Sequence, residues 1–534
     1  MAPRKRASSS QDDLFASEVE LLLPVRFAVE GRILGSLVTQ IEVPAGRVRC
    51  RLRPFAVRRV NGFETRLTSG ETLKIISKKT GMPLDGDLIL LVPGAGEPSH
   101  IAEALERGEG RWLNTAPANI ANISKAERVK RLSAVTNSWT DAVYLREGRA
   151  GDSGMPALPG LRRPQIGALH AALAHATRSI DPATIVMPTG TGKTETMLAL
   201  NAHQRFERLL VVVPTDALRE QIAAKFETFG VLRQQQCLAE GAAFPLVMRL
   251  SHIPTSPAEV DEIFNAANVV VTTMQIAGRA EPPVQERMAE RASALFIDEA
   301  HHIGAPTWAR FRGLFVDRDP PLPIVQFTAT PFREDGRRVD GEFIYTYPLK
   351  KAQAEGYFKP IRFEAVFGLE QGDADLAIAE KLGEVLQADL DGGLNHLAMA
   401  RCQTIDRAKD LHHLYSTLFP EFRPVIVHSQ QSIRDRKANL AALRRFESRI
   451  IVCVDMLGEG FDLPELKIAA LHDPHKSIAV TIQFVGRFTR QDPKLGDATV
   501  IANTGVDDID RSLAKLYAED ADWTAELARV AEPV

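Results

Sequence analysis

The hydrophobic positions of the chain fall into short runs that alternate with longer stretches of helical spacing. Runs of this kind, bounded by turn residues, are typical of strands buried on both faces of a parallel sheet. Strands that alternate with helices predict a parallel sheet covered by helices. Two successive series of runs therefore predict two tandem α/β domains. The first series comprises Ala183–Val186, Leu209–Val213, Asn268–Thr272, Ala294–Ile297 and Ile324–Phe327, and the second comprises His396–Arg401, Pro424–Val427, Ile450–Val454, Ile468–Leu471 and Ala498–Ile501.

A different pattern precedes these domains. Arginine alternates with apolar residues from Arg47 to Arg53, which places four arginines on one face of a predicted strand. Such a row is able to track a phosphate backbone, or to form a solvated face paired with acidic neighbours, and the sequence leaves both open. Phe63–Leu67 and Pro83–Leu91 predict further strands, and the stretch around Gly70–Thr80 predicts a helix. This order is similar to small barrels that bind DNA in some restriction and regulatory proteins.

These patterns divide the chain into five segments. Residues 1–13 are expected to be a disordered lead, and residues 14–150 an α+β accessory domain with a small barrel as one option. The Gly- and Pro-rich residues 151–160 read as a linker. Residues 161–345 and 346–534 are expected to form the first and second α/β domains, the second ending in a helical tail. Phe343–Lys359 is expected to cross from one domain to the other.

The composition indicates where in the cell the protein is expected and which kinds of partner it can bind. The chain of 534 residues is 45% hydrophobic and 25% charged, with a formal net charge of -3, so a polyanionic partner would have to meet local basic patches. The four cysteines are scattered, which argues against a disulfide framework or a zinc site. No apolar stretch reaches the roughly 20 residues that span a bilayer. We therefore expect a cytoplasmic protein with no membrane partner.

The chemistry centres on Met187–Thr194, which reads Met-Pro-Thr-Gly-Thr-Gly-Lys-Thr. A predicted strand precedes it and a helical stretch follows it, so loop amides and the helix N-terminus would cradle phosphates. Lys193 would reach the β- and γ-phosphates, and the Thr194 hydroxyl would hold Mg²⁺. The predicted cradle comprises Thr189, Gly190, Thr191, Gly192, Lys193 and Thr194.

A second strand ends in adjacent carboxylates, Asp298 and Glu299. The carboxyl end of this strand would lie beside the phosphate loop in a parallel sheet. Asp298 is suited to hold Mg²⁺, and Glu299 to polarise an attacking water. Phosphoryl transfer depends mainly on positioning and charge stabilisation, which these groups supply.

The motifs resemble those of superfamily 2 helicases and translocases with a DEAH-type second motif. The resemblance extends from about Leu161 to Asn503, and the wording is closest to restriction-motor and DNA-repair helicases. It implies two tandem RecA-like P-loop domains that bind ATP and Mg²⁺ and act on nucleic acid. By resemblance, Arg162 and Gln165 would contact the base, and Gly460 and Asp462 of the fifth motif would contact the nucleotide. Residues implied in nucleic-acid contact or in coupling are Pro214, Thr215, Thr272, Thr273, His301, Thr328, Thr330, Ser429 and Gln483.

The sixth motif of the resemblance runs from Gln483 to Arg490. Arg487 and Arg490 lie one helical turn apart, so both guanidinium groups would project from one face. Their fixed, delocalised charge suits the spread negative charge of a transferring phosphoryl group. Because they belong to the second domain, the site would be complete only when the cleft between the domains closes.

The motif wording favours DNA over RNA, because RNA-directed DEAD-box proteins usually carry a histidine where Gln483 stands. We expect an ATP-dependent DNA helicase or double-stranded DNA translocase in prokaryotic defence, restriction or repair. Two alternatives remain: an RNA-directed helicase, and an ATP-gated nucleic-acid sensor or scaffold with little unwinding. A nuclease or methyltransferase on a separate polypeptide is also left open as a partner.

Overall fold

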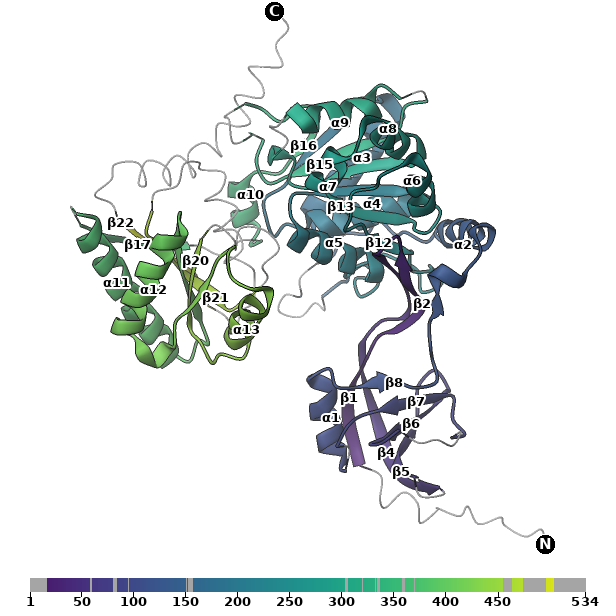
Figure 1. Cartoon of the computed structure of the whole chain (residues 1–534), viewed down its shortest axis with the longest axis horizontal. Coiled ribbons are helices and arrows are strands. Elements are labelled where there is room, and N and C mark those ends of the chain that lie inside the picture. The colour runs from purple at the N-terminus through teal and green to yellow at the C-terminus, as the bar shows by residue number, and fades with distance from the viewer. Residues whose placement is uncertain are drawn as a thin grey trace, which may run out of the picture.

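The computed structural model describes residues 17–57, 60–79, 84–94, 96–149, 151, 157–302, 306–318, 320–331, 333, 337–357, 361–368, 370–454, 463–473 and 496–503. Figure 1 shows them as a small sheet module near the N-terminus, a large first lobe and a second lobe. The predicted N-terminal lead and C-terminal helical tail lie outside the described residues. All four cysteines are buried.

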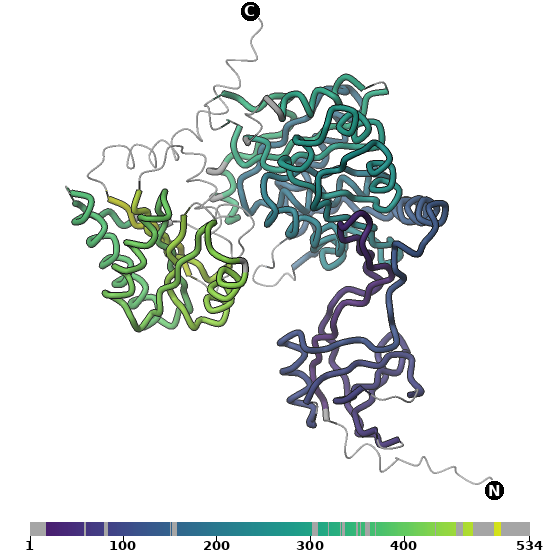
Figure 2. The backbone as a smooth tube through the Cα atoms, viewed as in Figure 1, coloured from purple at the N-terminus to yellow at the C-terminus, as the bar shows by residue number. Residues whose placement is uncertain are grey.

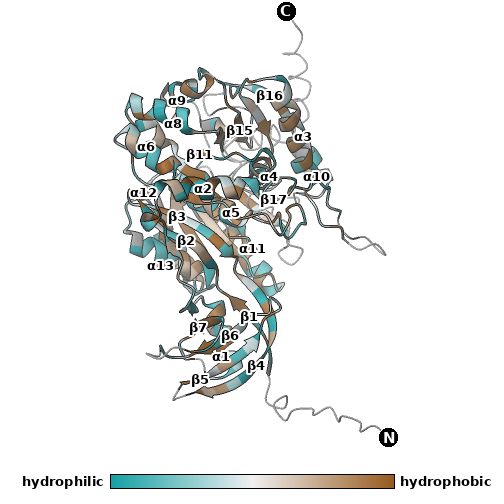
Figure 3. Cartoon of the chain, turned by 90° about the vertical axis from the view of Figure 1, so that its right-hand side faces the viewer, coloured by the Kyte–Doolittle hydropathy of each residue, from teal (hydrophilic) through white to brown (hydrophobic). Residues whose placement is uncertain are grey.

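The N-terminal module is a curled sheet with one helix on it, and Figure 3 shows the curl. Its elements are β1 (Ser17–Leu23), β4 (Gly46–Val57), β5 (Val60–Arg66), β6 (Thr72–Ile76), β7 (Leu88–Leu91), α1 (Pro98–Glu106) and β8 (Arg111–Trp112). The strand order is β1-β4-β5-β6-β7-β8. The structure therefore has a curled sheet with β1 and β8 at its ends, in place of the small barrel considered from the sequence. Leu21, Leu52, Leu73 and Leu90 are fully buried on one face and pack with Ile101 of α1.

The helix predicted around Gly70–Thr80 is wrong, because the structure has β6 there. Gly70 closes a turn with a left-handed φ of +88°, and its amide donates to the carbonyl of Leu67 at 2.9 Å. Leu73 and Ile75 are fully buried between β5 and β7. Two neighbouring strands outweigh the weak helical spacing of this segment, and its β-branched residues suit a pleated surface.

The first lobe is built on a ten-stranded sheet of order β16-β10-β15-β14-β11-β13-β12-β3-β2-β9. Its strands are β2 (Arg26–Ile33), β3 (Ser36–Val43), β9 (Ala118–Asn119), β10 (Ala183–Val186), β11 (Leu209–Val213), β12 (Val247–Arg249), β13 (Val269–Thr273), β14 (Ala294–Ile297), β15 (Ile324–Thr328) and β16 (Glu342–Thr346). Its helices are η2 (Ile120–Asn122), α2 (Lys125–Asn137), α3 (Arg163–Arg178), α4 (Lys193–Gln204), α5 (Asp216–Thr228), α6 (Pro257–Phe264), α7 (Met274–Arg279), α8 (Pro282–Arg291), η3 (Ala300–His302), α9 (Pro306–Val316) and α10 (Leu349–Ala354).

The five strands predicted for this lobe are present and parallel to their neighbours. Every residue of β10, β11, β13, β14 and β15 is buried, as expected for strands covered on both faces. Phe296 and Phe327 meet edge to face at 5.7 Å between ring centroids across β14 and β15. The carboxyl ends of these strands therefore share one edge of the sheet, which positions the residues that follow them.

The core of the first lobe does not follow the division expected at residue 150. The hairpin β2–β3 pairs antiparallel with β12 and extends the parallel sheet. Val29 and Val38 of this hairpin are fully buried in the core of the first lobe, together with Leu132 and Trp139 from α2 and the turn after it. Figure 2 shows the chain rising from the module to this hairpin at the first lobe and then returning to the module. The hairpin and α2 thus belong to the first lobe by packing.

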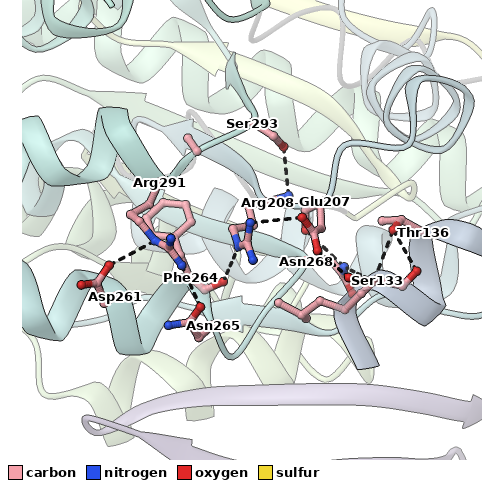
Figure 4. A network of polar contacts seen from close by, with 12 residues as sticks. Ser133, Thr136, Glu207, Arg208, Asp261, Phe264, Asn265, Asn268, Arg291 and Ser293 are labelled. Atoms are coloured by element: carbon pink, nitrogen blue, oxygen red, sulfur yellow. Dashed lines mark hydrogen bonds and ion pairs between the residues drawn. The ribbon is translucent and has the colours of Figure 1, made fainter. Parts of the chain in front are cut away.

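A polar network at the amino ends of the strands holds α2 in place (Figure 4). Asn268, which is fully buried, donates its side-chain amide to the carbonyls of Leu132 and Glu207 at 3.1 and 3.2 Å. Ser133 donates to the Glu207 carboxylate at 2.8 Å. Arg208 continues the network by donating to the carbonyl of Phe264 at 3.2 Å. These bonds satisfy buried polar groups that would otherwise be costly.

A buried ion pair fixes the hairpin from the other side. Arg249 of β12 forms a bidentate pair with Glu227 of α5, and Thr39 of β3 donates to the same carboxylate. Burial alone would lower the pKa of Arg249, but hydrogen bonds and charge from Glu227 and Glu220 outweigh burial and raise it. The pair therefore stays charged, and it joins β3, β12 and α5.

The first lobe also extends beyond its predicted end at residue 345. Phe343–Lys359 was expected to cross between domains, but β16 pairs parallel with β10 inside the first sheet. Tyr347 and Ala352 are buried in the same core, and Tyr357 packs against it. The edge strand and the short helix after it thus complete the first lobe.

The second lobe is a six-stranded parallel sheet of order β17-β22-β21-β18-β20-β19 with helices on it. Separate apolar clusters occupy its two faces, which confirms the predicted α/β layering. Its elements are β17 (Ile361–Val366), α11 (Gln371–Asp391), β18 (Leu397–Cys402), α12 (Ile405–Leu418), η4 (Pro420–Phe422), β19 (Val425–Val427), α13 (Ile433–Arg444), β20 (Ile450–Val454), β21 (Leu466–Leu471) and β22 (Ala498–Asn503).

Buried polar residues fix the end of β21. Asp375 of α11 contacts His472 Nδ1 at 2.8 Å and both nitrogens of the Arg407 fork at 2.7 and 3.0 Å. Tyr415 and His472 Nε2 are 2.9 Å apart. Burial lowers the pKa of His472, although Asp375 opposes the shift, so the imidazole is neutral.

None of the helices that the structure describes is long and apolar enough to span a lipid bilayer.

The Arg249–Glu227 pair predicts the cost of detaching the hairpin. Glu227→Ala should destabilise β3 locally by about 3 kcal/mol, because it leaves a buried guanidinium with Glu220 alone. Hydrogen exchange at the backbone amides of β3 should therefore be about 100-fold faster than in the parent chain. Glu447→Ala, which removes the exposed partner of Arg445, is the matched control and should leave exchange unchanged. Equal exchange of β3 in both variants would contradict the packing.

Candidate active site

The loop after β10 has the shape of a phosphate cradle. α4 begins at Lys193, directly after Gly192, whose φ of +100° is left-handed, and Gly190 has a φ of +87°. A side chain on Gly192 would also collide with the amide of Gln165. Both constraints require glycine, so the Gly-x-Gly-Lys spacing has a structural reason in this chain.

The two residues expected to contact the base lie against this loop. Arg162 donates from its guanidinium to the carbonyl of Gly190 at 2.8 Å. Gln165 is buried, and its side-chain oxygen accepts the backbone N–H of Arg162 at 2.8 Å, which caps α3. The start of α3 and the phosphate loop are therefore one hydrogen-bonded unit.

The acidic pair follows β14, as predicted. The backbone N–H of Asp298 donates to the carbonyl of Val212 at 3.0 Å, and that of Glu299 donates to the Asp298 carboxylate at 3.1 Å. Both residues are buried. Glu299 has a left-handed φ of +50°, a conformation that residues with side chains rarely adopt. Backbone strain of this kind gathers at functional sites.

An ion pair joins the two motifs across the sheet edge. Lys193 Nζ lies 3.1 Å from Glu299 Oε1, and each side chain is only 9% exposed. β10 and β14 flank β15 in the sheet, so the lysine and the glutamate approach each other over the end of β15. Each buried charge thereby has a counter-ion, without which its burial would be costly.

The end of β15 touches both sides of this pair. The carbonyl of Thr328 accepts the backbone N–H of Met187 at 2.9 Å. The hydroxyl of Thr328 donates to the carbonyl of Thr330 at 2.8 Å. His301 Nδ1 lies 3.1 Å from that hydroxyl and 3.6 Å from Glu299 Oε2. With the Thr328 hydroxyl donating to Thr330, a proton on Nδ1 would let His301 donate to that hydroxyl.

The glycine loop and the acidic pair line a cavity of about 1270 Å³. Its walls bring together the glycine loop, the acidic pair and the start of α3, which are far apart in the sequence. The predicted site residues on its lining are Arg162, Gln165, Thr189, Gly190, Gly192, Lys193, Thr194, Asp298 and Glu299. Thr191 is buried and donates its hydroxyl to the carbonyl of Pro188 at 2.6 Å, so it shapes the loop from behind.

A second group of predicted residues gathers at the carboxyl ends of β11 and β13. The strands pair in parallel with Val213 opposite Thr273. Pro214 and Thr215 therefore lie beside Thr272 and Thr273 at one edge. Thr215 is exposed and caps α5, whereas Thr272 and Thr273 are buried.

The remaining predicted site residues belong to the second-lobe part of the sequence. Ser429 is exposed after β19. Gly460, Asp462, Gln483, Arg487 and Arg490 lie outside the described residues, so their placement stays a prediction.

Sequence reasoning missed two parts of the cavity wall. Tyr357 lines the cavity, its ring centroid lies 5.7 Å from the Arg162 guanidinium, and its hydroxyl accepts the backbone N–H of Arg163 at 3.3 Å. Burial raises the pKa of Tyr357, so its hydroxyl stays protonated. Glu147, which pairs with Arg163 at 2.7 Å, also lines the cavity. Neither residue belongs to a recognisable motif, since each reaches the site through tertiary packing.

Two family models match the chain. The model described as "Type III restriction enzyme, res subunit" covers residues 159–333, and the model described as "Helicase conserved C-terminal domain" covers residues 380–492. Uncharacterized protein Rv2917 of Mycobacterium tuberculosis is 26% identical over 358 residues, 57% of this chain and 55% of that protein. ATP-dependent RNA helicase dbp-8 of Neurospora crassa is 33% identical over 128 residues, 23% of this chain and 20% of that protein. The chain spans about half the length of the first curated relatives it matches.

Two solved structures are similar over much of the chain. A fragment of a putative HsdR subunit of a type I restriction enzyme from Vibrio vulnificus has a TM-score of 0.46 and 16% identity, covering 91% of this chain and 88% of its own. Dbp5 of S. cerevisiae, bound to RNA and ADP BeF3, has a TM-score of 0.46 and 14% identity, covering 70% of this chain and 97% of its own.

The two family matches follow each other along the chain, one on each lobe, and the first contains the loop and the acidic pair whose contacts form the cavity. By these two matches the chain belongs to the superfamily 2 helicases, and its first lobe is related to the res subunit of type III restriction enzymes.

Proposed function

We propose that the chain is an ATP-dependent DNA translocase or helicase that moves on double-stranded DNA by cycles of closure between its two lobes. The observation that carries this proposal is the convergence of Lys193, Asp298, Glu299 and Gln165 on one cavity. A nucleotide-sized cavity with a lysine, two carboxylates and a glycine loop is suited to phosphoryl transfer and to little else.

The residues present fit a magnesium nucleotide. Gly190, Gly192 and Lys193 line the same cavity, so the loop and the lysine face the space that the phosphates would occupy. Thr194 and Asp298 would hold Mg²⁺, which neutralises phosphate charge when bound and usually takes only one or two protein ligands. Thr189 and Thr191 shape the cradle, while Arg162 and Gln165 would contact the base.

Glu299 has two roles in this proposal. It is the counter-ion of Lys193 at 3.1 Å, and in turnover it would orient and deprotonate the attacking water. Phosphate oxygens compete for the same ammonium, so nucleotide binding would release Glu299 for its catalytic role. His301 and Thr328 connect Glu299 to the end of β15, and Thr330 follows there, which supports a part for all three in coupling hydrolysis to movement.

The second lobe would complete the nucleotide site and the surface that contacts the nucleic-acid backbone. Arg487 and Arg490 would stabilise the transferring phosphoryl group, with Gly460 and Asp462 near the nucleotide. Pro214, Thr215, Thr272 and Thr273 would contact the nucleic-acid backbone from the first lobe, and Ser429 and Gln483 from the second. Such contacts are largely independent of sequence.

DNA is favoured over RNA by two features. The first-lobe model is that of a restriction-enzyme subunit, and Gln483 stands where RNA-directed DEAD-box proteins usually have histidine. The 33% identity to an RNA helicase over 128 residues favours the alternative of an RNA-directed motor. An ATP-gated nucleic-acid sensor or scaffold with little unwinding is the third candidate function, and the assays below separate it from a motor.

A panel of nucleic acids tests the proposal directly. ATP turnover should rise at least about tenfold with duplex DNA, because lobe closure on the track completes the site. Single-stranded DNA and duplex RNA are the comparison ligands, and a strand-displacement assay run beside them separates unwinding from translocation. Stimulation by RNA alone, or no stimulation by any nucleic acid, would contradict a DNA motor.

The role of Glu299 has its own test. Glu299→Gln should lower kcat by about 10² to 10⁴-fold, the usual loss for a general base, while ATP binding is retained. Glu195→Gln is the matched control, since Glu195 lines the same cavity but pairs with Lys225 at 3.3 Å. Turnover of Glu299→Gln close to that of Glu195→Gln would refute the assignment.

A further inference from the structure

The N-terminal module carries a row of arginines that the nucleotide cycle does not use. Arg47, Arg49, Arg51 and Arg53 of β4, together called the arginine face, are all exposed. The intervening Cys50 and Leu52 are buried in the core of the module. α1 packs against that core, so it covers the opposite side of the sheet. The alternation predicted from the sequence is therefore confirmed.

The geometry of this row suits a nucleic-acid backbone. Alternate residues of a strand lie about 6.7 Å apart, which is close to the separation of successive phosphates along one strand of a duplex. The guanidinium group is planar and always charged, and it contacts phosphate oxygens through two parallel hydrogen bonds. Four arginines at this spacing on one strand form a track rather than a single anion site.

Acidic neighbours pair with part of the row. Glu106 of α1 lies 2.7 Å from Arg47 in an ion pair whose two side chains are both exposed. Glu20 of β1 lies 3.5 Å from Arg47 and 3.4 Å from Arg49, distances well beyond those of tight charge-assisted hydrogen bonds. The Arg49 side chain is 83% exposed. Ion pairs between exposed side chains contribute little to stability, so phosphate can replace these carboxylates at small cost.

The module lies apart from the motor. It falls outside both family matches, which begin at residue 159. In Figure 1 it lies below the first lobe, joined by the strands that continue into the hairpin β2–β3. That hairpin is anchored by sheet pairing with β12, so the module is attached to the lobe that would hold the nucleotide.

We propose that the arginine face binds the phosphate backbone of double-stranded DNA, at a segment of the duplex outside the cleft between the lobes. This inference rests on the proposed function in taking DNA as the partner of the motor. Two contacts on one duplex raise the effective concentration of DNA at the cleft, so the module would lengthen each encounter without reading sequence.

The test measures binding of full-length protein to a short duplex that fills only the cleft and to a duplex several times longer, across a salt series. Arg51→Gln and the double variant Arg49→Gln/Arg51→Gln are compared with Arg107→Gln, an exposed arginine of the same module beyond α1. On the long duplex, the slope of log K against log salt should become shallower by about 0.9 for each arginine removed. The control slope, and all slopes on the short duplex, should be unchanged.

Basal ATP turnover without DNA should be the same in all variants, which shows that the fold is intact. Equal slopes for the double variant and Arg107→Gln on the long duplex would overturn the proposal. So would a loss confined to duplex RNA. If no nucleic acid stimulates turnover but the slope still falls, the arginine face is supported while the motor function fails. If turnover is stimulated and the slope is unchanged, the motor stands and the arginine face does not.

Discussion

The ion pair between Lys193 and Glu299 is the contact on which the site depends. It forms only because β10 and β14 run parallel on either side of β15, so that the residues after each strand meet at one edge. The pair balances two buried charges, and the bonds of Thr328 to Met187 and His301 connect it to the strand between. A polyphosphate is the natural competitor for this lysine, because it offers more negative charge than one carboxylate.

The same sheet also integrates the N-terminal part of the chain. The hairpin β2–β3 continues the parallel strands in antiparallel sense, and Arg249, Glu227 and Thr39 close that junction with buried polar contacts. The hairpin thus joins the sheet module to the first lobe through strand pairing and these polar contacts. The arginine face is therefore attached to the lobe that contains the glycine loop.

Much of this was predictable from the sequence because the signals were local. The apolar runs of β10, β11 and β14 have the predicted bounds, and the Gly-Lys-Thr loop and the acidic pair follow their strands as motif order requires. The predictions that were wrong concern segments whose structure is set by tertiary contacts. Pairing with β5 on one side and β7 on the other makes Thr72–Ile76 a strand, and pairing with β12 makes β3 part of the first lobe. Tyr357 reaches the cavity only through the packing of β16 and α10.

The central claim is that arginines of the second lobe complete a nucleotide site built by the first. The most direct measurement compares Arg487→Ala with the parent chain in ATP affinity and in DNA-stimulated kcat. The account predicts that kcat falls about 10³-fold or more, as for other arginine fingers, while the Kd for ATP changes only a few fold. An unchanged kcat would contradict a site shared between the two lobes.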